Sequence, residues 1–247
     1  MAFVLPVHNE ADSIAREVEV LSDYLANQEG QFEIHLVENG SSDDSAEVVR
    51  RMAAHPPQGA DRNTRIFGAS LENAGIGYAY DRGARDAWNG SRDSNAWVLF
   101  TAGDMPFGFS DFEQFRLLTK RPDLMFAVGS KAHHRSHVQT STKRNVASTV
   151  YRGVRRLCLG MRTADSQGTL FVRNNLAKEL AAQTEARGFF YSTEFIFWAE
   201  RRGIQPIEVP VTLRPQVRPT TVRVMHHGME MLRQTLALRG RAEREKP

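Results

Sequence analysis

Two short apolar runs near the start of the chain each end abruptly on polar residues. The first, residues 3–7, leads into residues 8–10, and the second, residues 34–37, leads into residues 38–41. Each polar cluster is followed by a stretch with the spacing of an amphipathic helix. Open, mostly parallel sheets bind their ligands at the carboxyl ends of their strands. Two such strand ends in one chain therefore predict a nucleotide pocket.

The alternation of strand and helix patterns continues to about residue 129. Such chains favour a right-handed, doubly wound and mostly parallel sheet flanked by helices, the α/β class. Beyond residue 130 a long basic stretch leads into a more helical region. Strands are expected at residues 32–37, 65–68, 96–101, 125–129, 169–172 and 207–213. Helices are expected at residues 14–25, 46–52, 75–89, 111–120, 145–159, 176–184, 193–202 and 222–238, with a loop at 54–64 and frayed residues after 238.

The composition is that of an ordinary globular protein. The 247 residues are 41% hydrophobic and 25% charged, enough for a sizeable core. The single cysteine, Cys158, excludes an intrachain disulfide and fits a reducing compartment. No apolar run approaches the roughly 20 residues of a membrane span, and no basic leader precedes the first strand. We expect a cytoplasmic protein, with peripheral contact at the inner face of the membrane as a further possibility.

Basic residues concentrate in one segment, residues 131–162, which contains no aspartate or glutamate. Such a local excess attracts phosphate-bearing ligands. For residues 152–156 a solvated helix face is the alternative interpretation. Tyr151 is the only aromatic residue of the segment and the net charge of the chain is a modest +3, so we expect no nucleic-acid partner.

The last expected helix carries an apolar stripe with two interpretations. The stripe either packs on its own domain or lies in a membrane interface, with the arginines of the helix meeting anionic headgroups. Its members, spaced i, i+3, i+7, i+10 and i+14, are Val222, Met225, Met229, Leu232 and Leu236.

Further polar elements follow the first two in a fixed order along the chain. They are residues 73–79, 102–104, 129–131, 165–168 and an acid at 194. In this order the elements resemble those of the family-2 glycosyltransferases of the GT-A fold, above all the polyprenyl-phosphate sugar transferases. The resemblance spans roughly residues 3–238. It implies one GT-A domain over 1–238, with a nucleotide-sugar-binding half at 1–129, an acceptor half at 130–238 and a charged tail at 239–247.

The resemblance implies that the first three elements bind the nucleoside-diphosphate sugar. The family commonly has two acids in the second element, where this chain has Glu38 and Asn39, so the choice of base stays open. A strand-end turn with a helix cap is the alternative interpretation of the first two elements. The expected donor-binding residues are Pro6, His8, Asn9, Glu10, Glu38, Asn39, Ser41, Asn73, Gly75 and Gly77.

The fourth element departs most from the family pattern. The family generally has Asp-x-Asp here, which binds a divalent ion bridging the diphosphate, and this chain has Ala102, Gly103 and Asp104. Asp104 matches the second acid, and Ala102 replaces the first. The resemblance implies that Mg²⁺ or Mn²⁺ is held by Asp104 together with diphosphate oxygens and water. A plain turn acid is the alternative role of Asp104.

The remaining elements are expected to handle the acceptor. Lys131 resembles a family cation that lies near the phosphates, and Lys143 and Arg144 resemble a loop that closes over an acceptor phosphate. Asp165 and Gln167 match the family's Asp-x-Gln, where the acid positions the acceptor, acts as base or braces the loop. Elsewhere in this half, Glu194 falls where the family has an acid that opens a helix, and Glu208 is expected to be structural.

The expected activity is a metal-dependent, inverting sugar transfer with Asp104, Asp165 and Lys131 as catalytic residues. The basic segment favours a polyprenyl phosphate as acceptor, because its oxygen is ionised near neutral pH and needs no strong base. A soluble hydroxyl acceptor is the first alternative, in which a carboxylate such as Asp165 removes the proton. The second alternative is a non-catalytic nucleotide-sugar binding protein, suggested by Ala102 and Asn39.

Overall fold

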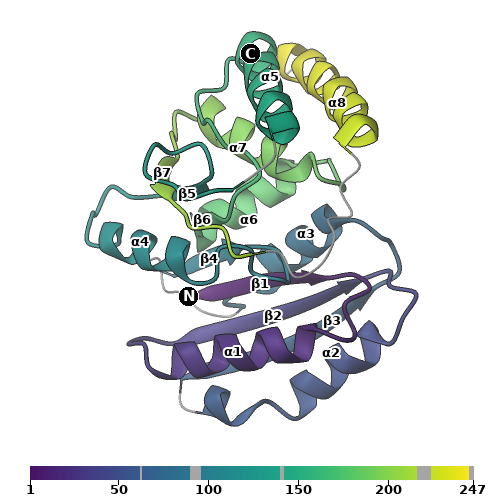
Figure 1. Ribbon diagram of the computed structural model, residues 1–247, viewed down its shortest axis with the longest axis vertical. Coiled ribbons are helices and arrows are strands. Elements are labelled where there is room, and N and C mark those ends of the chain that lie inside the picture. The colour runs from purple at the N-terminus through teal and green to yellow at the C-terminus, as the bar shows by residue number, and fades with distance from the viewer. Residues whose placement is uncertain (62, 90–95, 140–141, 216–223, 245–247) are drawn as a thin grey trace. The chain divides into compact units, whose positions relative to one another are not determined.

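The computed structural model describes residues 1–61, 63–89, 96–139, 142–215 and 224–244 (Figure 1). The chain divides into two compact units, and each unit is made of two stretches of chain. Unit 1 comprises Met1–Met105 and Thr169–Gly188, and unit 2 comprises Pro106–Gly168 and Phe189–Pro247. The expected division at residue 129 stays a prediction, and the compact units divide the chain at other residues.

Unit 1 contains five strands in the order β3-β2-β1-β4-β6. The pairs β3–β2, β2–β1 and β1–β4 are parallel, whereas β6 runs antiparallel to β4. The parallel pairs bring the carboxyl ends of their strands to one edge, where Val7 of β1 lies opposite Glu38 of β2. The strands are β1 (Ala2–Val7), β2 (Phe32–Asn39), β3 (Thr64–Leu71), β4 (Trp97–Phe100) and β6 (Leu170–Arg173).

Helices cover both faces of this sheet, which is why β1 and β2 are buried along their whole length. The helices α1 and α2 pack on one face, and α3 and α6, which contact each other, pack on the other (Figure 1). Apolar residues at helical spacing direct α1 to the sheet, among them Ile14, Val18 and Leu21. The helices are α1 (Ile14–Ala26), α2 (Ser45–Ala54), α3 (Ile76–Asp86) and α6 (Asn174–Gln183), with a short 3-10 helix η1 (Gln58–Asp61).

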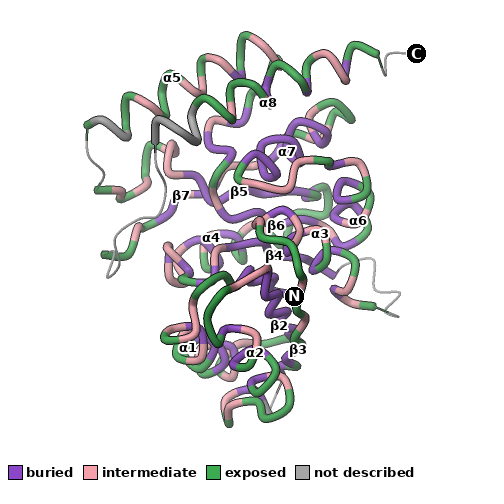
Figure 2. Tube along the Cα trace, turned by 90° about the vertical axis from the view of Figure 1, so that its right-hand side faces the viewer, coloured by how far each residue is buried: buried purple, intermediate pink, exposed green. Residues whose placement is uncertain are grey.

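Unit 2 is built around two parallel strands and a buried helix. The first nine residues of α7 are all buried, whereas α5 and α8 lie side by side with many exposed residues (Figure 2). The strands are β5 (Phe126–Ser130) and β7 (Ile207–Pro210), and the helices are α4 (Ser110–Leu118), α5 (Thr142–Leu159), α7 (Tyr191–Arg201) and α8 (Val224–Arg244).

The expected α/β class with a mostly parallel sheet is confirmed, and the expected elements occur with ends that mostly differ by three residues or fewer. Two local expectations are wrong. The loop expected at 54–64 contains η1. The fraying expected after residue 238 does not begin there, because α8 continues to Arg244, with Ala242 buried and Arg241 paired with Glu194. Residues 245–247 lie outside the described part.

Among the helices that the structure describes, none combines the length and the low polarity needed to span a bilayer.

Candidate functional site

The polar loops that follow β1 and β2 are tied together by hydrogen bonds. The backbone N–H of Asn9 donates to the Ser41 hydroxyl (3.1 Å), and that of Glu10 donates to the Ser45 hydroxyl (2.9 Å). The side-chain oxygen of Asn9 accepts from the N–H of Ser42 (2.8 Å). Asn9 has a φ of 55°, in the left-handed region that asparagine tolerates better than most residues. The structure thus brings the first two sequence elements together.

Asn39 is buried at the end of β2 and links three parts of unit 1. With its amide oriented so that donors meet acceptors, Nδ2 donates to the Val7 carbonyl oxygen (3.0 Å) and Oδ1 accepts from the N–H of Gly75 (3.1 Å). The Asn39 carbonyl oxygen accepts from Nδ1 of His8 (2.9 Å). An aspartate could accept from Gly75 but, when ionised, could not donate to Val7. Asn39, which stands where the family commonly has an acid, therefore has a structural role that an ionised acid could not fill. Base recognition by Asn39 stays a prediction.

Glu38 and Asp43 hold the turn that leads into α2. The buried Glu38 accepts from the N–H of Ser41 through Oε1 (2.5 Å). Asp43 accepts from the N–H groups of Ser45 (3.0 Å) and Ala11 (3.2 Å). Hydrogen bonding to the side chain of Ser45 foremost, and then to these two N–H groups, holds the pKa of Asp43 below its ordinary value. These contacts support the interpretation of a turn with a helix cap, and they leave a nucleotide-binding role of Glu38 as a prediction.

The glycines at the start of α3 allow another part of the same unit to approach closely. A Cβ on Gly75 or Gly77 would overlap the backbone of Arg187. The N–H of Gly77 donates to the Arg187 carbonyl oxygen (2.9 Å), and the Arg187 guanidinium lies 5.6 Å from the ring centroid of Tyr78. Sequence reasoning missed Arg187, because nothing in its sequence neighbourhood indicates contact with residues 75–78. The expected nucleotide contacts of these glycines and of the exposed Asn73 stay predictions.

The Glu10 carboxylate lies beside the residue that precedes Asp104, shortly after β4 ends. A Cβ on Gly103 would overlap the Glu10 carboxylate and the Pro6 carbonyl oxygen, so the loop after β1 touches the chain next to Asp104. Asp104 itself is exposed. Burial, with a smaller contribution from the charge of Asp104, raises the pKa of Tyr80 on α3. Asp104 therefore lies near Glu10 and α3, within the same unit as the strand-end loops.

The carboxylates at this strand end fit a metal site whose ligands come partly from the protein and partly from the substrate, rather than from the protein alone. The described residues contain no group of three or more His, Cys, Asp or Glu side chains that could hold a metal ion. Mg²⁺ commonly binds through one or two carboxylates and completes its shell with substrate phosphates and water. Asp104, with the Glu10 carboxylate beside Gly103, fits that mode of binding.

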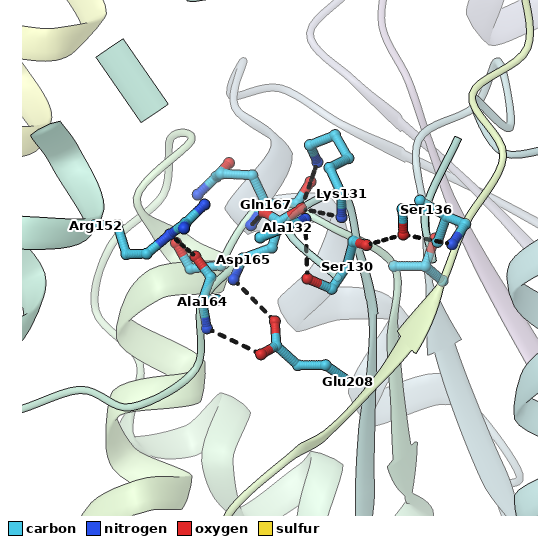
Figure 3. A network of polar contacts seen from close by, with 12 residues as sticks. Ser130, Lys131, Ala132, Ser136, Arg152, Ala164, Asp165, Gln167 and Glu208 are labelled. Atoms are coloured by element: carbon cyan, nitrogen blue, oxygen red, sulfur yellow. Dashed lines mark hydrogen bonds and ion pairs between the residues drawn. The ribbon is translucent and has the colours of Figure 1, made fainter. Parts of the chain in front are cut away.

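In unit 2, Asp165 connects Lys131 with Gln167 (Figure 3). Oδ2 of Asp165 accepts from the backbone N–H of Lys131 (2.8 Å) and lies 3.0 Å from its ammonium, and Oδ1 accepts from the N–H of Gln167 (2.9 Å). The Lys131 ammonium also donates to the Gln167 carbonyl oxygen (3.0 Å). Burial alone would raise the pKa of Asp165, but Lys131 and the backbone N–H donors hold it below the ordinary value.

A charged clamp, made of Arg152, Arg155, Glu200 and Glu208, holds residues 162–165. Four consecutive backbone N–H groups donate to the two glutamates, those of residues 162 and 163 to Glu200 (both 2.8 Å) and those of 164 and 165 to Glu208 (3.3 and 3.1 Å). The carbonyl oxygens of residues 163 and 164 accept from Arg155 (3.1 and 2.8 Å), and that of 164 also accepts from Arg152 (3.2 Å). The structural role expected for Glu208 agrees with these contacts.

The other expected acceptor residues are spread over unit 2. The Gln167 amide donates to the carbonyl oxygen of Phe189 (3.0 Å). Glu194 is buried on α7 and is paired with Arg241 of α8, so its expected place in the site stays a prediction. Lys143 and Arg144 belong to the first turn of α5, which corrects the expectation of a loop, and their side chains lie outside the described part.

A family model described as "Glycosyl transferase family 2" matches residues 2–173. The glycosyltransferase AglD of Haloferax volcanii is 26% identical over 219 residues, which are 87% of this chain and 33% of AglD. The chain thus spans about a third of the length of this curated relative.

Solved structures with the same fold include glucosyl-3-phosphoglycerate synthase from Mycobacterium tuberculosis. Its complex with UDP has a TM-score of 0.64 and 18% identity, covering 97% of this chain and 79% of that chain. Its complex with Mn²⁺, UDP-glucose and phosphoglyceric acid has a TM-score of 0.61 and 20% identity, covering 96% and 78%. At these identities the likeness shows the fold, which is the expected GT-A fold.

Proposed function

Because the chain belongs to glycosyl transferase family 2, we propose that it transfers a sugar from a nucleoside-diphosphate sugar to the phosphate of a polyprenyl phosphate, with inversion at the anomeric carbon. The observation that carries the choice of acceptor is the state of Asp165. Both of its carboxylate oxygens accept hydrogen bonds, and its pKa lies below the ordinary value. Such a carboxylate is a poor general base. An acceptor that is already ionised needs none.

In this proposal the residues of unit 1 bind the donor. The loops after β1 and β2 hold the nucleoside, and the N-terminus of α3 lies at the strand edge, where helix N–H groups favour anionic phosphates. Asp104, with Glu10 nearby, would hold Mg²⁺ or Mn²⁺, which when bound offsets the charge that develops on the departing diphosphate. The complex of the M. tuberculosis enzyme with Mn²⁺ and UDP-glucose supports this assignment.

In unit 2, Lys131 would bind the acceptor phosphate. An ammonium has three hydrogens, and the contacts with Asp165 and the Gln167 carbonyl oxygen leave one of them to donate to a phosphate oxygen. Asp165 then acts by fixing the position of the lysine rather than by moving a proton. Lys131 adds positive charge where the attacking oxygen carries negative charge.

The second candidate is transfer to a soluble hydroxyl compound, in particular a small phosphorylated acid. The observation that favours it is the phosphoglyceric acid bound in a structure of the same fold. Lys131 could hold the phosphate of such an acceptor equally well. This candidate requires a base for the hydroxyl proton, and the lowered pKa of Asp165 makes that residue a weak one.

The test is a transfer assay with UDP- and GDP-sugars, with Mg²⁺, Mn²⁺ or a chelator, and with either a polyprenyl phosphate or 3-phosphoglycerate as acceptor. We expect a metal-dependent polyprenyl-phosphate product whose anomeric configuration, measured by NMR, is opposite to that of the donor. Transfer to 3-phosphoglycerate alone would establish the second candidate. Saturable binding of a nucleotide sugar without transfer to either acceptor would instead indicate the non-catalytic alternative.

A further inference from the structure

The two neighbouring helices α5 and α8 of unit 2 expose a run of large apolar side chains. We name this set the α5–α8 apolar surface. The other large exposed apolar side chains of the described residues occur singly elsewhere, such as Leu117 on α4. The members of the α5–α8 apolar surface are Val146, Val150, Leu157, Met229, Leu232 and Leu236.

The helix α5 exposes large apolar side chains on one face and buries an arginine on the opposite face, whereas its partly buried residues include Tyr151, Val154 and Leu159. Val146, Val150 and Leu157 are spaced i, i+4 and i+11, which places them on one face, and Leu157 is 85% exposed. Arg155, on the opposite face, is buried and belongs to the charged clamp. A helix of a globular protein normally turns its apolar stripe to the core. The outer face of α5 is therefore suited to contact with an apolar surface.

The interpretation that α8 packs on its own domain through the expected stripe is wrong for the members whose side chains the structure describes. Met229 is 74% exposed, and Leu232 and Leu236 are exposed as well. The residues that α8 buries are instead Thr235, Leu238 and Ala242, on the other side of the helix. Val222 and the side chain of Met225 lie outside the described part.

The charges of the two helices are complementary to an anionic surface. The sequence of α5 contains no acid and five cations, of which Arg152 and Arg155 belong to the charged clamp. Exposed arginines flank the apolar side chains, namely Arg156 on α5 and Arg233 and Arg239 on α8. Of the two exposed glutamates of α8, Glu243 is paired with Arg239 (3.0 Å). Arginines can bury their stems along apolar surface and keep the guanidinium at a charged boundary.

The shape of this surface favours a lipid bilayer over a protein partner. An 18-residue helix extends for about 27 Å, and the apolar side chains of α5 are distributed along it rather than gathered in a compact centre. Protein interfaces more often place a compact apolar centre inside a polar rim. Interfacial helices combine an apolar strip with arginines that meet anionic headgroups. The α5–α8 apolar surface has these features of an interfacial helix.

We propose that the α5–α8 apolar surface docks the protein on an anionic phospholipid bilayer. Its apolar side chains enter the boundary between headgroups and acyl chains, and the exposed arginines contact lipid phosphates. The biological meaning of this contact rests on the proposed function, because a polyprenyl phosphate is reached only at a membrane. The contact itself can be measured without any sugar transfer.

The experiment is co-sedimentation of the full chain with vesicles of phosphatidylcholine alone or mixed with phosphatidylglycerol, at low and high salt. We expect binding to the anionic vesicles that weakens with salt, because screening reduces the electrostatic part. The double variant Val150→Glu/Leu157→Glu should bind at least tenfold more weakly. Leu117→Glu is the matched control, because Leu117 is 70% exposed on α4 of the same unit, and it should bind like the wild type.

Wild-type protein that stays in the supernatant with anionic vesicles at low salt would overturn the proposal, as would equal binding by the double variant. A double variant that sediments as a smaller species, with no vesicle binding by the wild type, would assign the surface to a second copy of the chain. Melting temperatures and nucleotide-sugar binding verify that the variants fold. Transfer to a polyprenyl phosphate dispersed in detergent tests the proposed function separately, so either proposal can fail while the other stands.

Discussion

At the scale of single residues, Asp104 has the clearest expected effect. Asp104→Ala should lower metal-dependent kcat/KM at least about a hundredfold, because it removes the carboxylate expected to hold the ion. Since Asp104 is exposed, the melting temperature should change little. The exposed Asp123→Asn serves as control and should retain activity. Equal activity of Asp104→Ala and wild type, or wild-type activity in excess chelator, would remove Asp104 from the metal site.

Ala102 offers the converse experiment at the same strand end. Ala102→Asp restores the acid that the family generally has, and it should lower the dissociation constant for Mn²⁺ because a second carboxylate can join the shell. The constant can be measured by calorimetry in the presence of the nucleoside diphosphate. An unchanged constant would mean that the side chain at 102 does not face the ion.

Asn39 connects a departure from the family pattern with stability. Asn39→Asp keeps an acceptor for the N–H of Gly75 but leaves the buried Val7 carbonyl oxygen without its donor. We expect a loss of about 1 to 3 kcal/mol in the free energy of unfolding at pH 7, measured by urea denaturation. Asn73→Asp, at an exposed position, should cost less. Equal stability of Asn39→Asp and wild type would contradict the bridging role of the amide.

Asp165 predicts a dependence of stability on pH. The pKa of Asp165 is lower in the folded protein than in the unfolded chain, where it is about 3.9. The ionised carboxylate therefore adds its full contribution to the free energy of unfolding above that unfolded pKa, and this contribution is lost as the pH falls through the lower folded pKa. In urea titrations from pH 6 to pH 3, Asp165→Asn should therefore lose less stability on acidification than the wild type does. Parallel pH dependences of the two proteins would contradict the ionised state of Asp165.

At the scale of elements, the charged clamp joins α5, α7 and β7 to the segment that ends at Asp165. Glu200→Ala leaves two backbone N–H groups, of residues 162 and 163, without their acceptor. We expect a loss of about 2 to 4 kcal/mol in the free energy of unfolding, because these are hydrogen bonds to a charged group. Glu243→Ala, on the exposed face of α8, is the control. A similar stability of both variants would show that the clamp contributes little.

The elements also show what sequence reasoning could and could not predict. Strands and helices were predictable because their apolar spacing is local, and the meeting of residues 8–10 with residues 38–41 followed from parallel strand order. The charged clamp could not be predicted, because Arg155, Glu200 and Glu208 meet only after three elements have packed. The exposed apolar face of α5 was also missed, because periodicity locates an apolar stripe but does not say whether that stripe faces the core or water.

At the scale of the whole molecule, the chain passes from one unit to the other three times, after residues 105, 168 and 188. Residues with expected or observed roles lie just before these passages, namely Asp104, Gln167 and Arg187. The sequence did not reveal this arrangement, because the one change in its strand-and-helix pattern, near residue 130, coincides with none of the three crossings. The residue boundary expected at 129 falls inside β5, within unit 2.

The interleaving of the two units limits how this chain can recombine with its relatives. β6 and α6 belong to unit 1 although they come after most of unit 2 in sequence, and β6 pairs with β4 from the first stretch. A chimera with a single junction at residue 105 would therefore give unit 1 strands of mixed ancestry at the β4–β6 pair. Each unit comes from a single parent only when residues 169–188 are exchanged together with residues 1–105. In a lineage, the two units should then diverge together more often than they are exchanged separately.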